Sequence, residues 1–102
     1  MEDVYVIGIG MTRFDKHLDR SVKGLAAEAL NKTLADAGIA KDAIEAAYFS
    51  NSMWGYHAEQ HCIRGQVALR DAKIMGIPIY NLENACGGGA TAFHNAWMGV
   101  TS

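Results

Sequence analysis

The segment from Pro78 to Ala92 constrains the fold of this 102-residue chain most. Residues 78–83 are rich in β-favouring side chains after a proline, a pattern typical of a strand. The strand is predicted to end at Cys86, because three glycines follow and then a run of helix-forming residues. Glycine in a helix interior costs about 1 kcal/mol relative to alanine. Three in succession therefore indicate that the backbone at these positions meets a requirement that outweighs helix propensity. Close packing, unusual torsions or exposed N–H groups are such requirements.

Cys86 is the predicted reactive residue of the chain. A cysteine at a helix N-terminus lies near the positive end of the helix dipole and near free amide donors, and both favour the nucleophilic thiolate. The arrangement is similar to the elbow that presents serine in hydrolases, and Gly87, Gly88 and Gly89 would form its support. The alternative is a small apolar filler, since free cysteines are often buried. The strand–cysteine–glycine–helix context favours the nucleophile.

The rest of the chain alternates between strand and helix patterns. The predicted strands cover residues 4–10, 47–51 and 78–83, and the predicted helices cover residues 22–37, 63–75 and 90–98. Ser21 is a good N-cap for the first helix, and Gly38 and Gly76 end the first two. This order predicts an α/β fold, β-α-β-α-β-α, with a three-stranded parallel sheet flanked by helices.

The loop at residues 52–62 follows the second predicted strand, where α/β proteins place ligands. Met53 and Trp54 are candidate substrate contacts, and the sequence favours equally that they pack beneath the loop. His94 follows Cys86 by eight residues in the chain, about 12 Å along a helix axis, which excludes a direct pair within that helix. We expect it to be a packed or interfacial histidine.

Two other kinds of site are disfavoured. A dinucleotide-binding fingerprint that starts at Gly8 and Gly10 needs a third glycine at the position of Arg13, so this kind of site is disfavoured. The two glycines instead indicate that the backbone of this segment packs closely on another part of the chain. Three candidate metal ligands lie close together in the sequence, namely His57, His61 and Cys62. Three ligands do not complete a tetrahedral zinc site, so we predict no metal and interpret them as a polar loop or pocket rim.

Charge and composition exclude further classes. A net charge of -2 without a lysine–arginine cluster disfavours nucleic-acid binding, and no apolar run reaches membrane-spanning length. The acidic start, Met1-Glu2-Asp3, is unlike a signal or transit peptide. Two cysteines without an export signal indicate free thiols, so we predict a cytoplasmic protein.

Two separated sets of motifs carry a resemblance to a known family. The first is VIGIGMTRF at residues 6–14, and the second comprises GQ at 65–66, GIPI at 76–79 and NACGGGATA at 84–92. Together they resemble the N-terminal part of thiolases of the sterol-carrier-protein type, over essentially the whole chain. The resemblance implies that Cys86 accepts an acyl group from a coenzyme A thioester. It also implies a homodimer that pairs through the strand at residues 78–83, and a small zinc-containing oligonucleotide-fold subunit as a further partner.

The same resemblance implies that residues 1–102 form a single, incomplete N-terminal domain. The histidines that activate the cysteine in thiolases, and a second acid/base residue, lie in motifs that match no position of this chain. The first strand is then expected to leave an unpaired edge and uncovered apolar surface.

The predicted function is acyl-CoA C-acyltransfer, as Claisen condensation or as thiolytic cleavage of a 3-oxoacyl-CoA. The thioester is a substrate, and no permanently bound cofactor is expected. The segment alone is predicted to be inactive, because carbon–carbon chemistry also needs a base and donors for the enolate. The alternatives are a thiolase-like retro-aldol lyase acting on a coenzyme A thioester, a non-catalytic scaffold subunit, and a redox-sensing thiol.

Overall fold

The computed structural model describes residues 3–102, so Met1 and Glu2 of the acidic start lie outside the described residues. In chain order the elements are α1 (Val22–Ala37), a 3-10 turn η1 (Lys41–Ala43), β1 (Ala47–Ser50), α2 (Trp54–Ala58), α3 (Arg64–Arg70), β2 (Ile79–Leu82), a 3-10 turn η2 (Ala85–Gly87) and α4 (Gly88–Thr101). β1 and β2 are parallel. The predicted combination of parallel strands and helices is confirmed.

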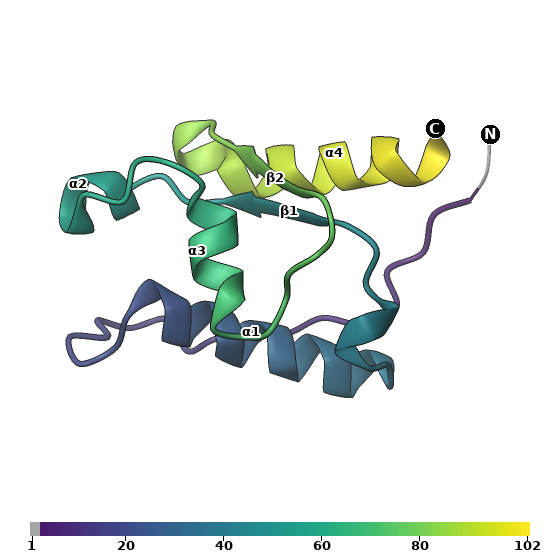
Figure 1. The fold of residues 1–102 in the computed structure, drawn as a ribbon, viewed down its shortest axis with the longest axis horizontal. Coiled ribbons are helices and arrows are strands. Elements are labelled where there is room, and N and C mark those ends of the chain that lie inside the picture. Colours follow the sequence, from purple (N-terminus) through teal and green to yellow (C-terminus); the bar gives the residue numbers. More distant parts are fainter. Residues whose placement is uncertain (1–2) are drawn as a thin grey trace.

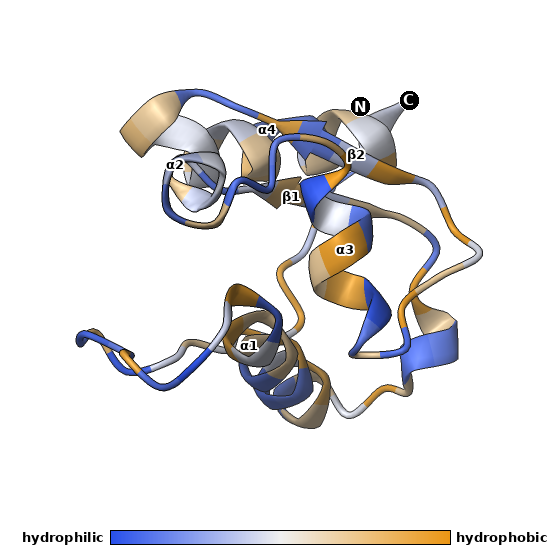
Figure 2. Cartoon of the chain, turned by 60° about the vertical axis from the view of Figure 1, so that its left-hand side comes forward, coloured by the Kyte–Doolittle hydropathy of each residue, from blue (hydrophilic) through white to orange (hydrophobic). Residues whose placement is uncertain are grey.

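The elements form layers around this strand pair. α4 covers one face of the strands, α3 covers the other, and α1 packs on α3 (Figure 1). Hydrophobic residues gather on α3, which lies between the strands and α1 (Figure 2). Two of the few buried apolar residues, Leu34 of α1 and Ala68 of α3, belong to this contact region. Part of the small core therefore lies between the sheet and α1, and further buried residues lie on α2 (Trp54) and on α4 (Ala92).

α1 begins and ends where the sequence predicts. The Ser21 hydroxyl accepts a hydrogen bond from the Gly24 amide at 3.1 Å, which caps the helix N-terminus. Gly38 adopts the left-handed conformation and donates its N–H to the Leu34 carbonyl at 2.9 Å. The prediction for the second helix was too long, because α3 ends at Arg70. After α3 the chain turns at Lys73, which has a positive φ of 67°, and the next residue, Ile74, is buried.

The prediction of a third strand at residues 4–10 is wrong. Residues 8–10 lie along α1, Val4 and Tyr5 lie beside α4, and none of residues 4–10 belongs to the sheet, which has two strands within the described residues. The Ile9 amide donates to the Asp36 carboxylate of α1 at 2.9 Å. A side chain at Gly10 would collide with the Ala29 carbonyl, and one at Gly8 would lie 2.7 Å from Ala37 Cβ. The close backbone approach is confirmed, and the segment is no strand because it packs on a helix, away from any strand edge.

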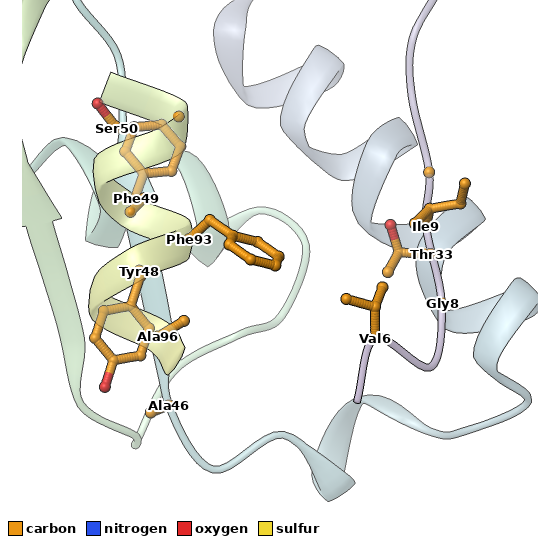
Figure 3. Close-up of a pocket in the computed structure, with 13 residues that line it drawn as sticks. Val6, Gly8, Ile9, Thr33, Ala46, Tyr48, Phe49, Ser50, Phe93 and Ala96 are labelled. Atoms are coloured by element: carbon orange, nitrogen blue, oxygen red, sulfur yellow. The ribbon is translucent and has the colours of Figure 1, made fainter. Parts of the chain in front are cut away.

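A groove separates this N-terminal segment from β1. It has a volume of about 690 Å³, and its walls come from residues 6–10, α1, β1 and α4. Phe93 of α4 projects into it towards Val6 and Thr33 on the opposite wall (Figure 3). Within the described residues, β1 pairs along one edge only. The groove thus separates a strand edge from a segment with the apolar sequence of a strand.

The surface of the chain is large for its mass. The accessible area is 7319 Å², whereas a folded monomer of 11.0 kDa is expected to expose about 5,600 Å². Val6, Ile7 and Ile9 are all exposed, and so is Phe93. The expectation of uncovered apolar surface is confirmed. Of the helices in residues 3–102, none combines the length and apolarity that a membrane crossing requires.

We expect Gly10→Ala to detach the N-terminal segment from α1. The added methyl group would meet the Ala29 carbonyl and the Thr33 backbone, which cannot rotate away, so the variant should lose about 1–3 kcal/mol of unfolding free energy. Gly24→Ala is the matched control, because a Cβ there meets only Ser21 Oγ at 3.5 Å. Denaturant titration of the two variants measures the difference. Equal stability of both would contradict this packing of residues 8–10 on α1.

Glu28 makes the stability of the fold around α1 depend on pH. Its carboxylate accepts hydrogen bonds from Lys32 at 2.9 Å and Arg20 at 2.6 Å, and these hold the pKa of Glu28 below its ordinary value of 4.5. A lowered pKa stabilises the fold above the unfolded-state value, and this contribution is lost as the pH falls through the folded-state value. Glu28→Gln should therefore be slightly less stable than wild type at neutral pH. The unfolding free energies of wild type and Glu28→Gln should converge as the pH is lowered. A difference between them that stays constant with pH would be inconsistent with this ion-pair cluster.

Candidate functional site

The candidate site lies where the two parallel strands end. In the strand register Ser50 is opposite Leu82, so the segments that follow β1 and β2 leave the sheet at the same edge. The first leads to α2, and the second leads through η2 into α4. Both lie at the same end of the molecule in Figure 1. This edge of an α/β sheet is where ligands bind in proteins of this class.

Cys86 is exposed at this edge. It lies in η2, between the end of β2 at Leu82 and the start of α4 at Gly88. The predicted order of strand, cysteine and helix is therefore present. The cysteine occupies the tight turn that precedes the helix, so its side chain is outside the helix proper.

The unusual backbone torsion of this turn falls on Ala85. Its φ is 45°, in the left-handed region that non-glycine residues seldom adopt. The Ala85 amide donates to the Glu83 carboxylate. Gly87 and Gly88 have φ values of -90° and -59°, which any residue can adopt. Sequence reasoning missed Ala85, because alanine carries no preference for a positive φ.

The three glycines serve different purposes. Gly88 packs directly on β1, because a Cβ at this position would collide with Ser50 Oγ and lie 3.1 Å from Ser50 Cβ. A Cβ at Gly87 would meet Asn84 Nδ2 at 3.4 Å. A Cβ added at Gly89 would point into open space, with no neighbouring heavy atom of the described residues within 4 Å. The sequence predicted that the glycines serve close packing, unusual torsions or exposed N–H groups. Close packing is the reason for glycine at position 88.

Three hydrogen bonds link the two sides of Cys86. The Gly87 amide donates to the Asn84 carbonyl at 2.8 Å, and Asn84 Nδ2 donates to Thr91 Oγ1 at 2.9 Å. The Thr91 hydroxyl in turn donates to the Gly87 carbonyl at 3.1 Å. Asn84 and Thr91 therefore form a ring of contacts around Cys86 that the sequence analysis did not identify. The four-residue spacing from Gly87 to Thr91 was the available signal, since threonine often bonds back by one turn.

Met53 and Trp54 follow β1 at this edge. Asn51 Oδ1 accepts hydrogen bonds from both of their amides, at 3.1 and 2.7 Å, which fixes the start of α2. The Trp54 side chain is only 8% exposed and its ring centroid lies 6.4 Å from that of Phe49. Met53 is 49% exposed. Trp54 thus packs beneath the loop, whereas Met53 faces solvent.

A small cavity of about 180 Å³, with both polar and apolar walls, lies beside this site. Its lining includes Asn51, His61 and Arg64 from the first side and Glu83 from the second. Arg64 donates to the carbonyls of Asn51 and Gln60, at 2.7 and 2.8 Å, and so ties the loop to α3.

The candidate metal ligands do not form a cluster, and His94 lies along α4. Among residues 3–102, no three side chains of His, Cys, Asp or Glu converge as metal ligands do. This applies to the set that the sequence brings close together: His57, His61 and Cys62. His94 stacks on Trp97 of the same helix, with ring centroids 5.8 Å apart.

Comparison with known proteins gives one consistent result. Residues 4–102 match the family described as "Thiolase, N-terminal domain". Sterol carrier protein 2 of Gallus gallus is 40% identical over 95 residues, which cover 87% of this chain and 16% of that protein. Acetyl-CoA acetyltransferase of Methanocaldococcus jannaschii is 34% identical over 102 residues, which cover 100% of this chain and 26% of that protein. Benzoylsuccinyl-CoA thiolase subunit BbsB of Thauera aromatica is 36% identical over 97 residues, which cover 91% of this chain and 23% of that protein. The chain thus spans about a sixth to a quarter of the length of these relatives.

Substitutions at two adjacent glycines should have opposite effects. Gly88→Ala should cost about 1–3 kcal/mol of unfolding free energy, because its methyl group overlaps Ser50. Gly89→Ala should be neutral or stabilise α4 by up to about 1 kcal/mol, because the space is open and alanine favours helix. Denaturant titration distinguishes them. Adding Ser50→Ala to Gly88→Ala should recover part of the loss, and no recovery would contradict this contact.

Proposed function

The chain belongs to the thiolase family, whose N-terminal domain it matches over residues 4–102, and we propose from this that it supplies the nucleophile of an acyl-CoA C-acyltransferase. The observation that carries the proposal is the exposed Cys86 in a tight turn between a parallel strand and a helix. A cysteine so placed is accessible to a thioester and lies near the amide groups of a helix N-terminus. The names of the relatives, acetyl-CoA acetyltransferase and benzoylsuccinyl-CoA thiolase, support a coenzyme A thioester as substrate.

The first chemical step is transfer of the acyl group to sulfur. The Cys86 thiolate attacks the thioester carbonyl, the bond from that carbon to the coenzyme A sulfur breaks, and the coenzyme A thiol leaves with the proton that Cys86 gave up. The acyl-cysteine then acylates the α-carbon of a second acyl-CoA. In the degradative direction, Cys86 takes the acyl group released from a 3-oxoacyl-CoA and passes it to coenzyme A.

The carbon–carbon step needs groups that we assign to further polypeptide. A base must remove the proton beside the thioester carbonyl, and hydrogen-bond donors must stabilise the enolate. We propose that residues 1–102 alone do not turn over substrate, and that they are one part of a larger N-terminal domain. The large exposed area and the open groove support this.

The substrate and partner assignments belong to the same proposal. We propose Met53 as an acyl-chain contact, because it is exposed at the carboxyl edge, and Trp54 as the residue that holds this loop from beneath. A second copy would pair along the outer edge of β2, which is unpaired within the described residues. We also propose a cytoplasmic protein, no bound cofactor, and a small oligonucleotide-fold subunit as a further partner.

Replacing Cys86 tests the proposed function. In the full polypeptide that carries these residues, brief exposure to acetyl-CoA or a longer acyl-CoA should add one acyl group, detected by intact mass spectrometry. Cys86→Ala should abolish the adduct and lower turnover by at least about a thousandfold. Cys62→Ala is the matched control, since Cys62 is also an exposed free thiol, and it should retain both.

Other outcomes would point to the alternative functions. If Cys86→Ala still forms or cleaves the carbon–carbon bond at the wild-type rate, the acyltransferase proposal is contradicted and the retro-aldol lyase is favoured. A wild-type protein that gains no acyl group and turns over no thioester would favour the scaffold subunit. Mass increases from peroxide alone, without any acyl adduct, would favour the redox-sensing thiol.

A further inference from the structure

We propose that Asn84 and Thr91 are positioning residues that hold Cys86 in its attacking orientation, an inference that rests on the proposed acyl transfer. Neither residue is assigned a chemical step. They are joined to each other by the 2.9 Å bond from Asn84 Nδ2 to Thr91 Oγ1. Each also bonds the backbone of Gly87, the residue immediately after Cys86.

The turn around Cys86 needs such support because its backbone is not in a relaxed conformation. Ala85, directly before the cysteine, has a φ of 45°. A non-glycine residue persists in this region only where its surroundings impose it. If the constraint is removed, Ala85 can relax towards a negative φ, and the adjoining Cys86 side chain then rotates with the peptide.

The contacts of Thr91 are suited to imposing that constraint. Its hydroxyl accepts from Asn84 on the strand side of the turn and donates to Gly87 on the helix side. Thr91 lies within α4, and its own carbonyl accepts from Asn95 Nδ2 at 2.8 Å, one turn further on. The hydroxyl therefore connects both sides of the turn to a regular helix. The Asn84 carbonyl closes the ring by accepting from the Gly87 amide at 2.8 Å.

The chemistry gives this role a distinct signature. Attack on a bound thioester requires the sulfur to approach the carbonyl carbon along a defined direction, and a displacement of about 1 Å can cost about a hundredfold in rate. Alkylation by iodoacetamide, a small molecule that approaches from solvent, depends on exposure and thiolate content instead. Loss of positioning should therefore slow acylation and leave alkylation unchanged.

Thr91→Val tests the inference, because it removes the hydroxyl and keeps the branched shape. In the full polypeptide, the single-turnover rate of Cys86 acylation by acetyl-CoA should fall about tenfold to a hundredfold, while the iodoacetamide rate stays the same. Thr91→Ser, which restores a hydroxyl, should recover the acylation rate. Thr101→Val is the matched control: Thr101 makes the same backward bond in the same helix, to the Trp97 carbonyl at 3.1 Å, but lies far along α4 from the turn.

The outcomes separate this inference from the function on which it rests. Equal acylation of wild type and Thr91→Val overturns the inference and leaves the proposed function intact. Parallel loss of acylation and alkylation also overturns it, because the change then lies in exposure or thiol reactivity. A wild-type protein that takes no acyl group overturns both. If Thr91→Val does not fold, Asn84→Leu tests the same bond, since it removes the Nδ2 donor without adding a charge beside Cys86, and it should show the same split between the two rates.

Discussion

Parallel pairing of β1 and β2 is the interaction on which the site depends. The register sets Ser50 beside Leu82, so the loop that leads to α2 and the turn that contains Cys86 leave the sheet together. Polar contacts from α3 hold β2 in position. The Gly65 amide donates to Asn81 Oδ1 at 2.6 Å, and the Gln66 side chain donates to the Ile79 carbonyl at 3.2 Å. A shift of β2 by one residue would break these bonds and turn Asn81 to the opposite face.

The contact between Gly88 and Ser50 transmits this register to the nucleophile. Because no side chain separates them, the first turn of α4 rests directly on the last residue of β1. The position of α4 in turn fixes Thr91, and through it the turn around Cys86. The glycine needed for fit thus lies two residues after the cysteine, and the backbone strain lies one residue before it. A glycine-rich motif need not place its strain at the glycines.

The sequence predicted what local chemistry controls and missed what depends on distant partners. Ser21 and Gly38 bound α1 through contacts within a few residues, so the pattern of cap, apolar stripe and glycine was sufficient. The strand-to-helix change around Cys86 was predictable for the same reason. The apolar residues 4–10 have the composition of a strand, but strand formation needs a neighbour across the sheet, and here the Asp36 carboxylate takes up the Ile9 amide instead. The roles of Ala85 and Thr91 arise from the closed hydrogen-bond ring, which no composition pattern encodes.

The open groove also bears on how such a polypeptide is made in a cell. Its walls include Val6, Phe49 and Phe93, so the chain presents apolar surface beside a strand edge that is unpaired within the described residues. Chaperones and neighbouring nascent chains compete for surfaces of this kind. The time for which the groove stays open therefore bears on the yield of folded protein, alongside the stability of α1 and of the strand pair. Low temperature during expression would act on that interval.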